Sequence, residues 1–163
     1  MTKSEKVLEV IHDLLRIIAF HSILGECRSA DDNAEEARRV LQNSLMEMFV
    51  VKWSLLFLNR KGERHRIWVV QPFADRFPAY LEEARLRAEF DTYCQNIFAI
   101  RDMYVTHLDD RERVNAAELR WPILQNGKRY LFALRNIVSD EENEELFNSY
   151  LAIARAGFAN LKS

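Results

Sequence analysis

The stretch "IRDMYVTHLDD", Ile100 to Asp110, holds the residues of this chain that are best suited to chemistry on a phosphodiester. Arg101 and His107 stand six positions apart, and Asp102 follows the arginine. Arginine stays cationic and can grip two phosphate oxygens at once. Histidine titrates at about pH 6.5 and can therefore act as a general base or acid. A carboxylate such as that of Asp102 can orient one of the other two groups. Because the 2′-OH of RNA supplies its own nucleophile, these residue types are compatible with cleavage of RNA, but the set alone does not establish it.

The bare spacing of an arginine and a histidine is weak support for a site. With seventeen Arg and four His in the chain, about one pair with four to six intervening residues is expected by chance. Three such pairs occur, Arg16–His21, Arg60–His65 and Arg101–His107. The first lies in an apolar segment, and the second straddles Gly62 in a basic turn. The third has an acidic residue near each partner, so its context favours it over the other two.

This segment resembles the signature of the HEPN superfamily, and most closely that of its abortive-infection-associated branch. The signature is an arginine, a polar residue that is often Asn or Asp, four further residues with a small one last, a histidine and often a nearby acid. Arg101, Asp102, His107 and Asp109 match these positions, whereas Thr106 stands where the branch often has alanine. Members are small helical bundles with the motif late in a long helix. The predicted helical architecture resembles that of the family over most of the chain, whereas the motif itself matches over only about ten residues.

The resemblance implies metal-independent cleavage of RNA by a homodimer, without a cofactor, with two motifs meeting at the dimer interface. Many members serve toxin–antitoxin or phage-defence systems, which implies an antitoxin or a nucleotidyltransferase as a partner. Other members bind nucleotides or act only as scaffolds. A second hypothesis is therefore a non-catalytic HEPN-like module that binds a protein partner or a nucleotide. A structural bundle without a ligand site is the third.

Helix geometry constrains how the pair could act. Six residues turn an ideal helix by about 600° and advance it by about 9 Å, which leaves Arg101 and His107 about 120° apart. One straight helix would not point both side chains at one phosphate. Either the helix distorts near His107 or the site combines residues from two chains, and the second alternative supports a dimer. The plain alternative is that His107 meets the dipole of the last helical turn while Arg101 pairs with Asp102, Glu89 or another acid.

A second basic segment, "NRKGERHR", could guide an RNA backbone toward the site by neutralising phosphates. Its basic residues are Arg60, Lys61, Arg64 and Arg66. Such a turn is more often only solvated. His107, Asp109 and Asp110 would crowd three ligands into four residues, which is a poor spacing for a tetrahedral metal site, so we predict no metal.

Composition limits the class of protein. The 163 residues suffice for one domain, and 48% hydrophobic with 29% charged residues is typical of a globular protein. The formal net charge of −2 disfavours non-specific wrapping of nucleic acid. Two cysteines without a CxxC pair favour a reducing compartment, and we expect the cytoplasm. The most apolar run, Met48 to Leu58, is too short to span a bilayer, so no membrane partner is expected.

Four Gly and three Pro are few for this length and favour long helices. Hydrophobic periodicity predicts one all-α domain over residues 1–163, an antiparallel bundle of four to five helices. We expect helices over about 4–23, 31–61, 79–107 and 128–138, and a last one from Ser139, whose pairing with Glu142 would form a capping box. Residues 66–78 are predicted to be a connector that packs Trp68 and Phe73 onto the bundle.

The second predicted helix is the most apolar. Its expected inner stripe is Ala34, Ala37, Leu41, Leu45, Met48 and Leu55. Beyond Met48 it is apolar on nearly all sides, which predicts a central position or a face buried in a partner. Pro72 and Pro78 are expected to break any helix, and Pro122 and Gly127 to end a loop.

Overall fold

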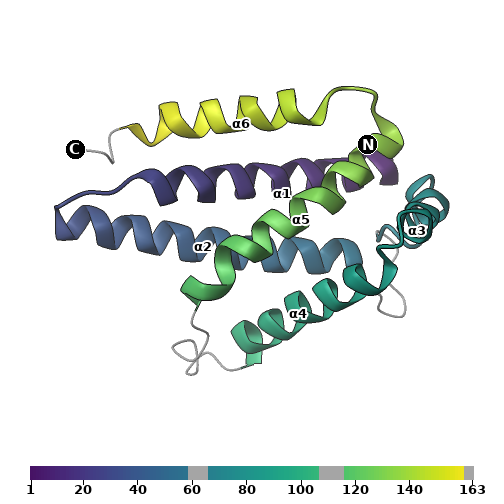
Figure 1. Ribbon diagram of the computed structural model, residues 1–163, viewed down its shortest axis with the longest axis horizontal. Coiled ribbons are helices and arrows are strands. Elements are labelled where there is room, and N and C mark those ends of the chain that lie inside the picture. The colour runs from purple at the N-terminus through teal and green to yellow at the C-terminus, as the bar shows by residue number, and fades with distance from the viewer. Residues whose placement is uncertain (59–65, 107–115, 160–163) are drawn as a thin grey trace.

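Six α-helices make up the described part of the chain in the computed structural model (Figure 1). The structure describes residues 1–58, 66–106 and 116–159, and no strand occurs within them. The helices are α1 (Lys3–Glu26), α2 (Asp32–Phe57), α3 (Phe73–Glu83), α4 (Arg87–Thr106), α5 (Ala116–Val138) and α6 (Asn143–Gly157). Consecutive long helices run in opposite directions, and α6 returns beside α1. The predicted all-α bundle is confirmed, with one helix more than expected.

Side-chain caps fix the starts of α1 and α2. The Thr2 hydroxyl accepts a hydrogen bond from the Glu5 amide, and the Glu5 carboxylate accepts one from the Thr2 amide, which is a complete capping box. The Asp31 carboxylate accepts from the Asn33 amide at the start of α2. The predicted start of the second helix is therefore confirmed.

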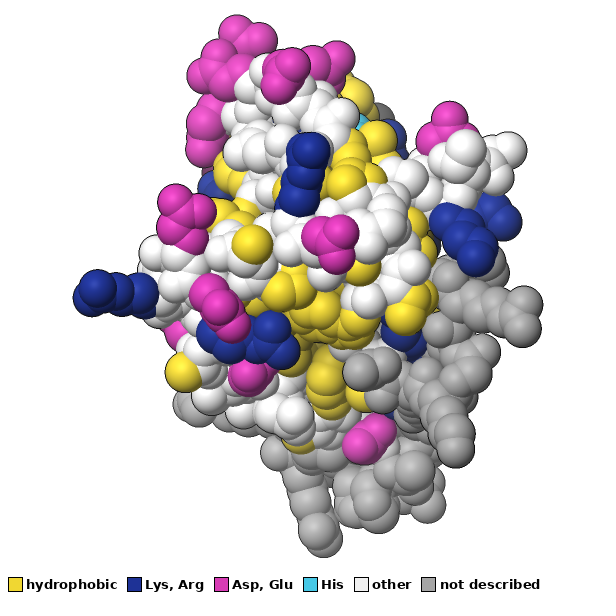
Figure 2. Space-filling model, turned by 90° about the vertical axis from the view of Figure 1, so that its right-hand side faces the viewer, with side chains coloured by type: hydrophobic (Ala, Val, Ile, Leu, Met, Phe, Trp, Pro, Cys, Tyr) yellow, Lys and Arg dark blue, Asp and Glu magenta, His cyan; other side chains and the backbone are white. Residues whose placement is uncertain are grey.

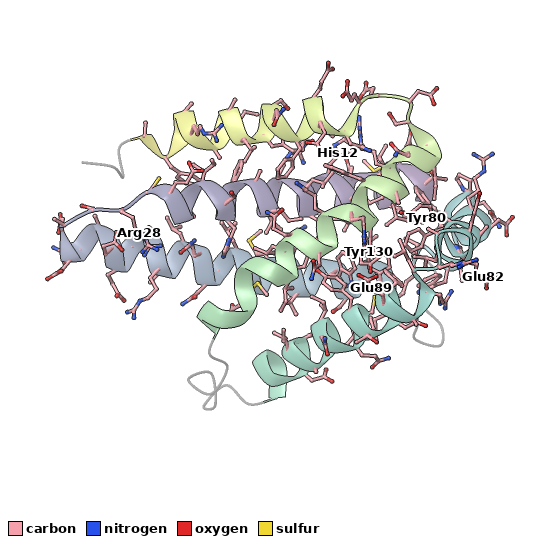
Figure 3. All side chains as sticks on the ribbon, in the orientation of Figure 1. His12, Arg28, Tyr80, Glu82, Glu89 and Tyr130 are labelled. Atoms are coloured by element: carbon pink, nitrogen blue, oxygen red, sulfur yellow. The ribbon has the colours of Figure 1, made fainter. Side chains whose placement is uncertain are left out.

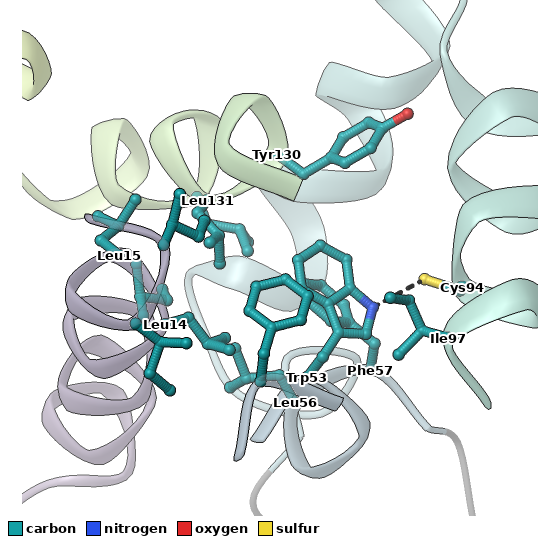
Figure 4. Packing of buried hydrophobic residues seen from close by; sticks show 14 of the residues in the cluster. Leu14, Leu15, Trp53, Leu56, Phe57, Cys94, Ile97, Tyr130 and Leu131 are labelled. Carbon is teal, nitrogen blue, oxygen red and sulfur yellow. Dashed lines mark hydrogen bonds between the residues drawn. The ribbon is translucent and has the colours of Figure 1, made fainter. Parts of the chain in front are cut away.

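An aromatic cluster at the centre of the molecule joins α2 to α4 and α5. Trp53 is fully buried, its ring centroid is 4.3 Å from that of Phe57 and 4.9 Å from that of Tyr93, and its Nε1 donates to the sulfur of Cys94 (Figure 4). The connector adds Trp68, whose Nε1 donates to the carbonyl of Phe57 at 2.8 Å. The buried aromatic rings thus pack α4 against α2, and this packing fixes the position of the C-terminal end of α4.

The buried face of α2 is not the one that the periodicity indicated. Met46, Phe49, Val50, Trp53 and Phe57 are buried. Ala37, Leu41, Met48 and Leu55, which were expected inside, are exposed. Beyond Met48 both faces of α2 carry apolar residues, and the face with the aromatic rings removes more apolar area from water for each residue buried. That face therefore takes the core. Four of the six residues of the predicted stripe point outward, whereas Ala34 and Leu45 are half-buried and Leu45 packs against the core.

A break between α3 and α4 replaces the single helix that was expected over 79–107. Arg85 has φ 56°, in the left-handed region, and the amide of Leu86 donates to the carbonyl of Leu81 at 2.7 Å. This closing bond is that of a Schellman-type helix end, which usually places glycine at the left-handed position. Since arginine stands there instead, the sequence carries no glycine to mark the stop.

Residues that were expected to interrupt helices lie inside them. Pro78 lies within α3, and Pro122 and Gly127 lie within α5, so the predicted loop is wrong for residues 116–127, and its earlier part lies outside the described residues. Gly127 is buried, and a Cβ added there would lie 2.5 Å from the hydroxyl of Tyr93. This glycine allows a close approach of α5 to the core and does not end a helix.

The start of α6 also differs from the prediction. The Ser139 hydroxyl accepts from the amide of Glu141, no side chain caps α6, and the capping box from Ser139 to Glu142 is therefore wrong. Arg135 holds the turn instead. Its buried guanidinium donates to the carbonyl and the carboxylate of Glu141 and to the side chain of Asn143. Figure 2 shows acidic side chains gathered over this turn and the start of α6, at the top of the view.

None of the helices in the described ranges combines the length and the apolar composition that a bilayer crossing requires.

Candidate functional site

Arg101 and Asp102 lie near the C-terminal end of α4, which ends at Thr106. The Arg101 side chain is 22% exposed, and its Nη1 lies 3.6 Å from an oxygen of Asp102, whose side chain is 69% exposed. An ion pair this long and this exposed contributes little to stability. Both residues take the place late in a helix that the sequence predicted. His107 follows α4 directly and lies outside the described residues, as does Asp109.

A cleft of about 330 Å³ follows α4 toward this end of the helix. Ile97, Ala99 and Ile100 give it apolar walls, and Asn96 and Asn126 place two amides on its rim. Among the α4 residues whose side chains the structure describes, the lining reaches Ile100, which precedes the arginine of the motif. Apolar walls with a few polar groups are typical of small-ligand sites, and a nucleobase has the matching flat apolar face and polar edge.

Tyr93 joins the two walls of this cleft. Its hydroxyl donates to the carbonyl of Ile123 at 2.5 Å, which ties α4 to α5. Burial raises the pKa of Tyr93 well above its ordinary value of about 10, so the hydroxyl keeps its proton and remains a donor. This hydrogen bond therefore holds the two walls of the cleft in a fixed position, against which a ligand can pack.

Of the four basic residues predicted to contact RNA, the described ranges include only Arg66. It is 6% exposed, and its guanidinium donates to the carbonyl of Ser54 in the last turn of α2. The last carbonyls of a helix lack helical partners, so this contact stabilises the end of α2. A buried guanidinium is poorly placed to neutralise phosphates, and we leave Arg66 out of the proposed RNA-binding residues. Arg60, Lys61 and Arg64 lie outside the described residues.

The fold also assembles a polar cluster that the sequence did not reveal, around His12 of α1, which is labelled in Figure 3. Nδ1 of His12 lies 2.7 Å from the hydroxyl of Tyr150, and the guanidinium of Arg16 lies over the Tyr150 ring, 5.0 Å from its centroid. Asp13 accepts from both Arg16 and Lys52 at 3.1 Å. His12 and Tyr150 are 138 positions apart in the chain, so no local motif marks this cluster.

This polar cluster is better explained as a connection between helices than as a phosphate site. Burial, and then the nearby Arg135 and Arg16, lower the pKa of His12 below its ordinary value of about 6.5, which favours its neutral form. The hollow of about 720 Å³ beside it is open, and its wall includes three acids, Glu5, Glu9 and Asp13. Their negative charges would repel an RNA backbone.

The thiol of Cys94 lies at the centre of the core. Burial raises its pKa to about 12, and the hydrogen bond from Trp53 opposes that rise only in part. A thiol that stays protonated at neutral pH is a poor nucleophile, so Cys94 is a packing residue. Within residues 1–58, 66–106 and 116–159, no three His, Cys, Asp or Glu side chains gather as a metal site.

Comparison with known proteins found no match, either among protein-family models, among curated proteins or among solved structures. The resemblance to the HEPN superfamily therefore stays a prediction that rests on the motif.

Proposed function

We propose that this chain is a metal-independent endoribonuclease of the HEPN type, with an active site formed at a homodimer interface. The observation that carries the proposal is the segment "RDMYVTH", whose Arg101 and Asp102 lie late in α4 of an all-α bundle. The cleft that α4 and α5 form beside this segment gives the motif a place where a nucleotide can bind.

The proposed reaction needs one proton acceptor, one proton donor and a cation. His107 takes the proton of the 2′-OH or gives one to the leaving 5′-oxygen, and a water molecule fills the other role, so that the proton lost by the 2′-oxygen is balanced by the one that the 5′-oxygen gains. The 2′-oxygen forms a bond to phosphorus as the bond to the 5′-oxygen breaks, which yields a 2′,3′-cyclic phosphate and a 5′-OH. Arg101 holds the phosphate oxygens and stabilises the charge that grows on them. Asp102 orients one of these two groups.

Two chains explain how Arg101 and His107 can act on one phosphate. On an ideal helix their side chains are about 120° apart and about 9 Å apart along the axis. An arginine from one copy and a histidine from the other avoid this restriction. A two-fold axis near the ends of the two α4 helices would bring Arg101 of each copy close to His107 of the other.

Single-stranded RNA is the proposed substrate class. The bases of single strands are free to turn outward, and an apolar wall with amides on its rim can hold one base while the arginine holds the adjoining phosphate. By resemblance we assign the activity to toxin–antitoxin or phage-defence systems, with an antitoxin or a nucleotidyltransferase as the partner.

The alternative is a non-catalytic HEPN-like module that binds a protein partner or a nucleotide. The cleft favours the nucleotide form of this alternative, because a free nucleotide would place its base and its phosphate in the same positions as a nucleotide of RNA.

The test is cleavage of single-stranded RNA in the presence of EDTA by the wild type and by His107→Ala and Arg101→Ala. Arg87→Ala is the matched control, because Arg87 lies on the same helix, is exposed and pairs with Asp91 much as Arg101 pairs with Asp102. We expect the wild type and Arg87→Ala to cleave, and the two motif variants to lose about 100-fold or more. Equal cleavage by His107→Ala would contradict the proposal. A wild type that binds a nucleotide but cleaves no RNA would support the alternative.

A further inference from the structure

The outward face of α2 carries a row of apolar side chains that the described bundle leaves exposed. We call it the α2 stripe, and it consists of five apolar residues, Ala37, Leu41, Met48, Val51 and Leu55, and the small polar residue Ser44, whose hydroxyl donates to the carbonyl of Val40. Leu41 is 40% exposed, and Met48, Val51 and Leu55 are between 47% and 53% exposed. Eight large hydrophobic side chains are exposed in the described ranges, and five of them lie on α2, so this exposure is concentrated on one helix.

The spacing of the α2 stripe is that of a helix that packs against another helix. Its members follow one another at intervals of four, three, four, three and four residues, which is the a/d pattern of a heptad repeat. The stripe runs over nineteen residues, from Ala37 to Leu55, and its two ends are about 27 Å apart along the helix. Phe49 and Trp53 take the opposite side of α2, where Gly127 of α5 packs against them. The helix is therefore apolar on two sides, and its own bundle uses one of them.

Two of the charges beside the α2 stripe are compensated within the same chain. Lys52 donates to Asp13 of α1 at 3.1 Å, and Arg38 donates to Glu35 at 2.7 Å. A second copy that approached this face would therefore not meet an unpaired charge at Lys52 or Arg38, and burial of these groups would not leave a lone charge out of water.

We propose that the α2 stripe is a homodimer interface in which two copies of α2 pack antiparallel. Their two-fold axis crosses the stripe at the height of residue 46, midway between Ala37 and Leu55. In this register Leu55 of one copy faces Ala37 of the other, and Met48 faces Ser44. Each larger side chain then meets a smaller one, which fills the space between the helices evenly. In a parallel pair each residue would face the same residue of the other copy. Leu55 would face Leu55 and Ala37 would face Ala37, which would leave gaps at the small residues.

The size of the α2 stripe fits an interface of modest affinity. A face about 27 Å long and about 10 Å wide offers on the order of 300 Å² in each copy. A specific interface buries about 1,000 Å² in total, so the stripe supplies its apolar centre and the polar side chains around it supply the rim. We therefore expect a dimer that dissociates on dilution.

The antiparallel arrangement also bears on the active site, and this step rests on the proposed function. α1 lies along one side of α2 and α4 along the other, and α4 runs back toward the middle of α2 (Figure 1). A two-fold axis perpendicular to an antiparallel pair keeps both α4 helices on the same side of the dimer. Their ends with Arg101 then approach the axis together, whereas a parallel pair would place them on opposite sides.

The oligomeric state tests the interface directly. The wild type, Met48→Glu and Ile153→Glu are compared by analytical ultracentrifugation over a range of concentrations, with circular dichroism as a check of the fold. Ile153 is the matched control, because it is 57% exposed on α6 and receives the same change. We expect the wild type and Ile153→Glu to dimerise and Met48→Glu to be monomeric at the same concentrations. A monomeric wild type, or a Met48→Glu variant that dimerises as well as the wild type, would overturn the interface.

Cross-linking tests the register. Ala37→Cys protein is oxidised alone and after mixing with Leu55→Cys protein, with the wild type as the background for its two buried cysteines. The antiparallel pair predicts a disulfide between the two variants and little between two copies of Ala37→Cys, which would be about 27 Å apart along the helix. Dimers of Ala37→Cys alone, without the mixed product, would overturn the antiparallel register.

The interface and the proposed function fail separately. If the wild type dimerises through the α2 stripe and cleaves no RNA, the interface stands and the nuclease does not. If monomeric Met48→Glu cleaves RNA as fast as the wild type, the nuclease stands and the link between this interface and the active site is wrong.

Discussion

The two faces of α2 differ in what covers them, although both are apolar and both follow helical periodicity. The inner face carries Phe49, Trp53 and Phe57, which are buried against α4 and α5. The outer face carries the α2 stripe, which the described bundle leaves exposed. The comparison teaches that apolar periodicity locates a helix but does not say which apolar face its own core will take. The volume of the side chains decides that, because the aromatic face gains more from burial.

Trp53→Ala should produce the largest effect, because it removes the side chain at the centre of the inner face. Trp53 contacts aromatic rings of α2, α4 and α5. The cavity left by the substitution would therefore be lined by three helices, which are not free to move inward and fill it. We expect a loss of about 3–5 kcal/mol in the free energy of unfolding, measured by urea denaturation. A loss below about 1 kcal/mol would mean that the inner face is not the core of the bundle.

Gly127→Ala tests how closely α5 approaches the inner face. The added methyl would lie 2.5 Å from the hydroxyl of Tyr93 and 3.0 Å from the ring of Phe49. We expect a loss of about 1–3 kcal/mol from this overpacking, although alanine is the better helix former. Gly157→Ala is the control, since no atom lies within 4 Å of its added Cβ, and it should be neutral or slightly stabilising. Urea denaturation of both variants checks the difference, and equal stability would refute the close approach.

Leu55→Gln changes the outer face and should leave the fold of one chain almost unaffected. The side chain is 53% exposed, so the free energy of unfolding of the dilute monomer should change by less than about 0.5 kcal/mol. Dimerisation should weaken, as sedimentation over a range of concentrations would show. A loss of monomer stability as large as that of Trp53→Ala would mean that the two faces of α2 do not differ as described.

His12 lies on α1, at its contact with α6 and away from both faces of α2, so its effect on stability should appear only as a dependence on pH. Its pKa in the folded chain is lowered by burial and by the neighbouring arginines, so the unfolded chain binds the proton more readily. The stability that this provides is present above about pH 6.5 and is lost as the pH falls toward the lowered pKa of the folded state. The wild type should therefore lose stability more steeply than His12→Gln, by less than about 1.4 kcal/mol for each pH unit. Denaturant titrations between pH 7.5 and pH 5 measure the slopes, and a steeper loss in His12→Gln would have the wrong sign.

Much of the fold could be predicted because its causes are local. Helical periodicity and the scarcity of glycine and proline predicted an all-α bundle, and Asp31 marked the start of α2. The predicted connector over 66–78 is wrong from residue 73 on, because α3 begins there, but the predicted burial of Phe73 is confirmed and followed from its size and apolar character. The place of Arg101 late in a helix followed from the same periodicity.

The rest depended on contacts between distant parts of the chain. Arg85 ends α3 in a conformation that usually calls for glycine, so no residue type announced the break. Gly127 looked like a stop, but its role is set by Tyr93, which lies on another helix. The pairing of His12 with Tyr150 joins the two ends of the chain. In the candidate site the sequence supplied Arg101 and Asp102, whereas the cleft beside them exists only once α4 and α5 are packed together.

Subunit complementation tests the central claim, an RNA-cleaving site shared by two copies, most directly. Arg101→Ala and His107→Ala proteins are assayed for RNA cleavage in EDTA, each alone and after mixing under conditions that let dimers exchange. If one copy supplies the arginine and the other the histidine, mixed dimers regain one intact site, and the mixture should recover about a quarter of the wild-type activity. A mixture as inactive as its two components, beside an active wild type, would contradict the shared site.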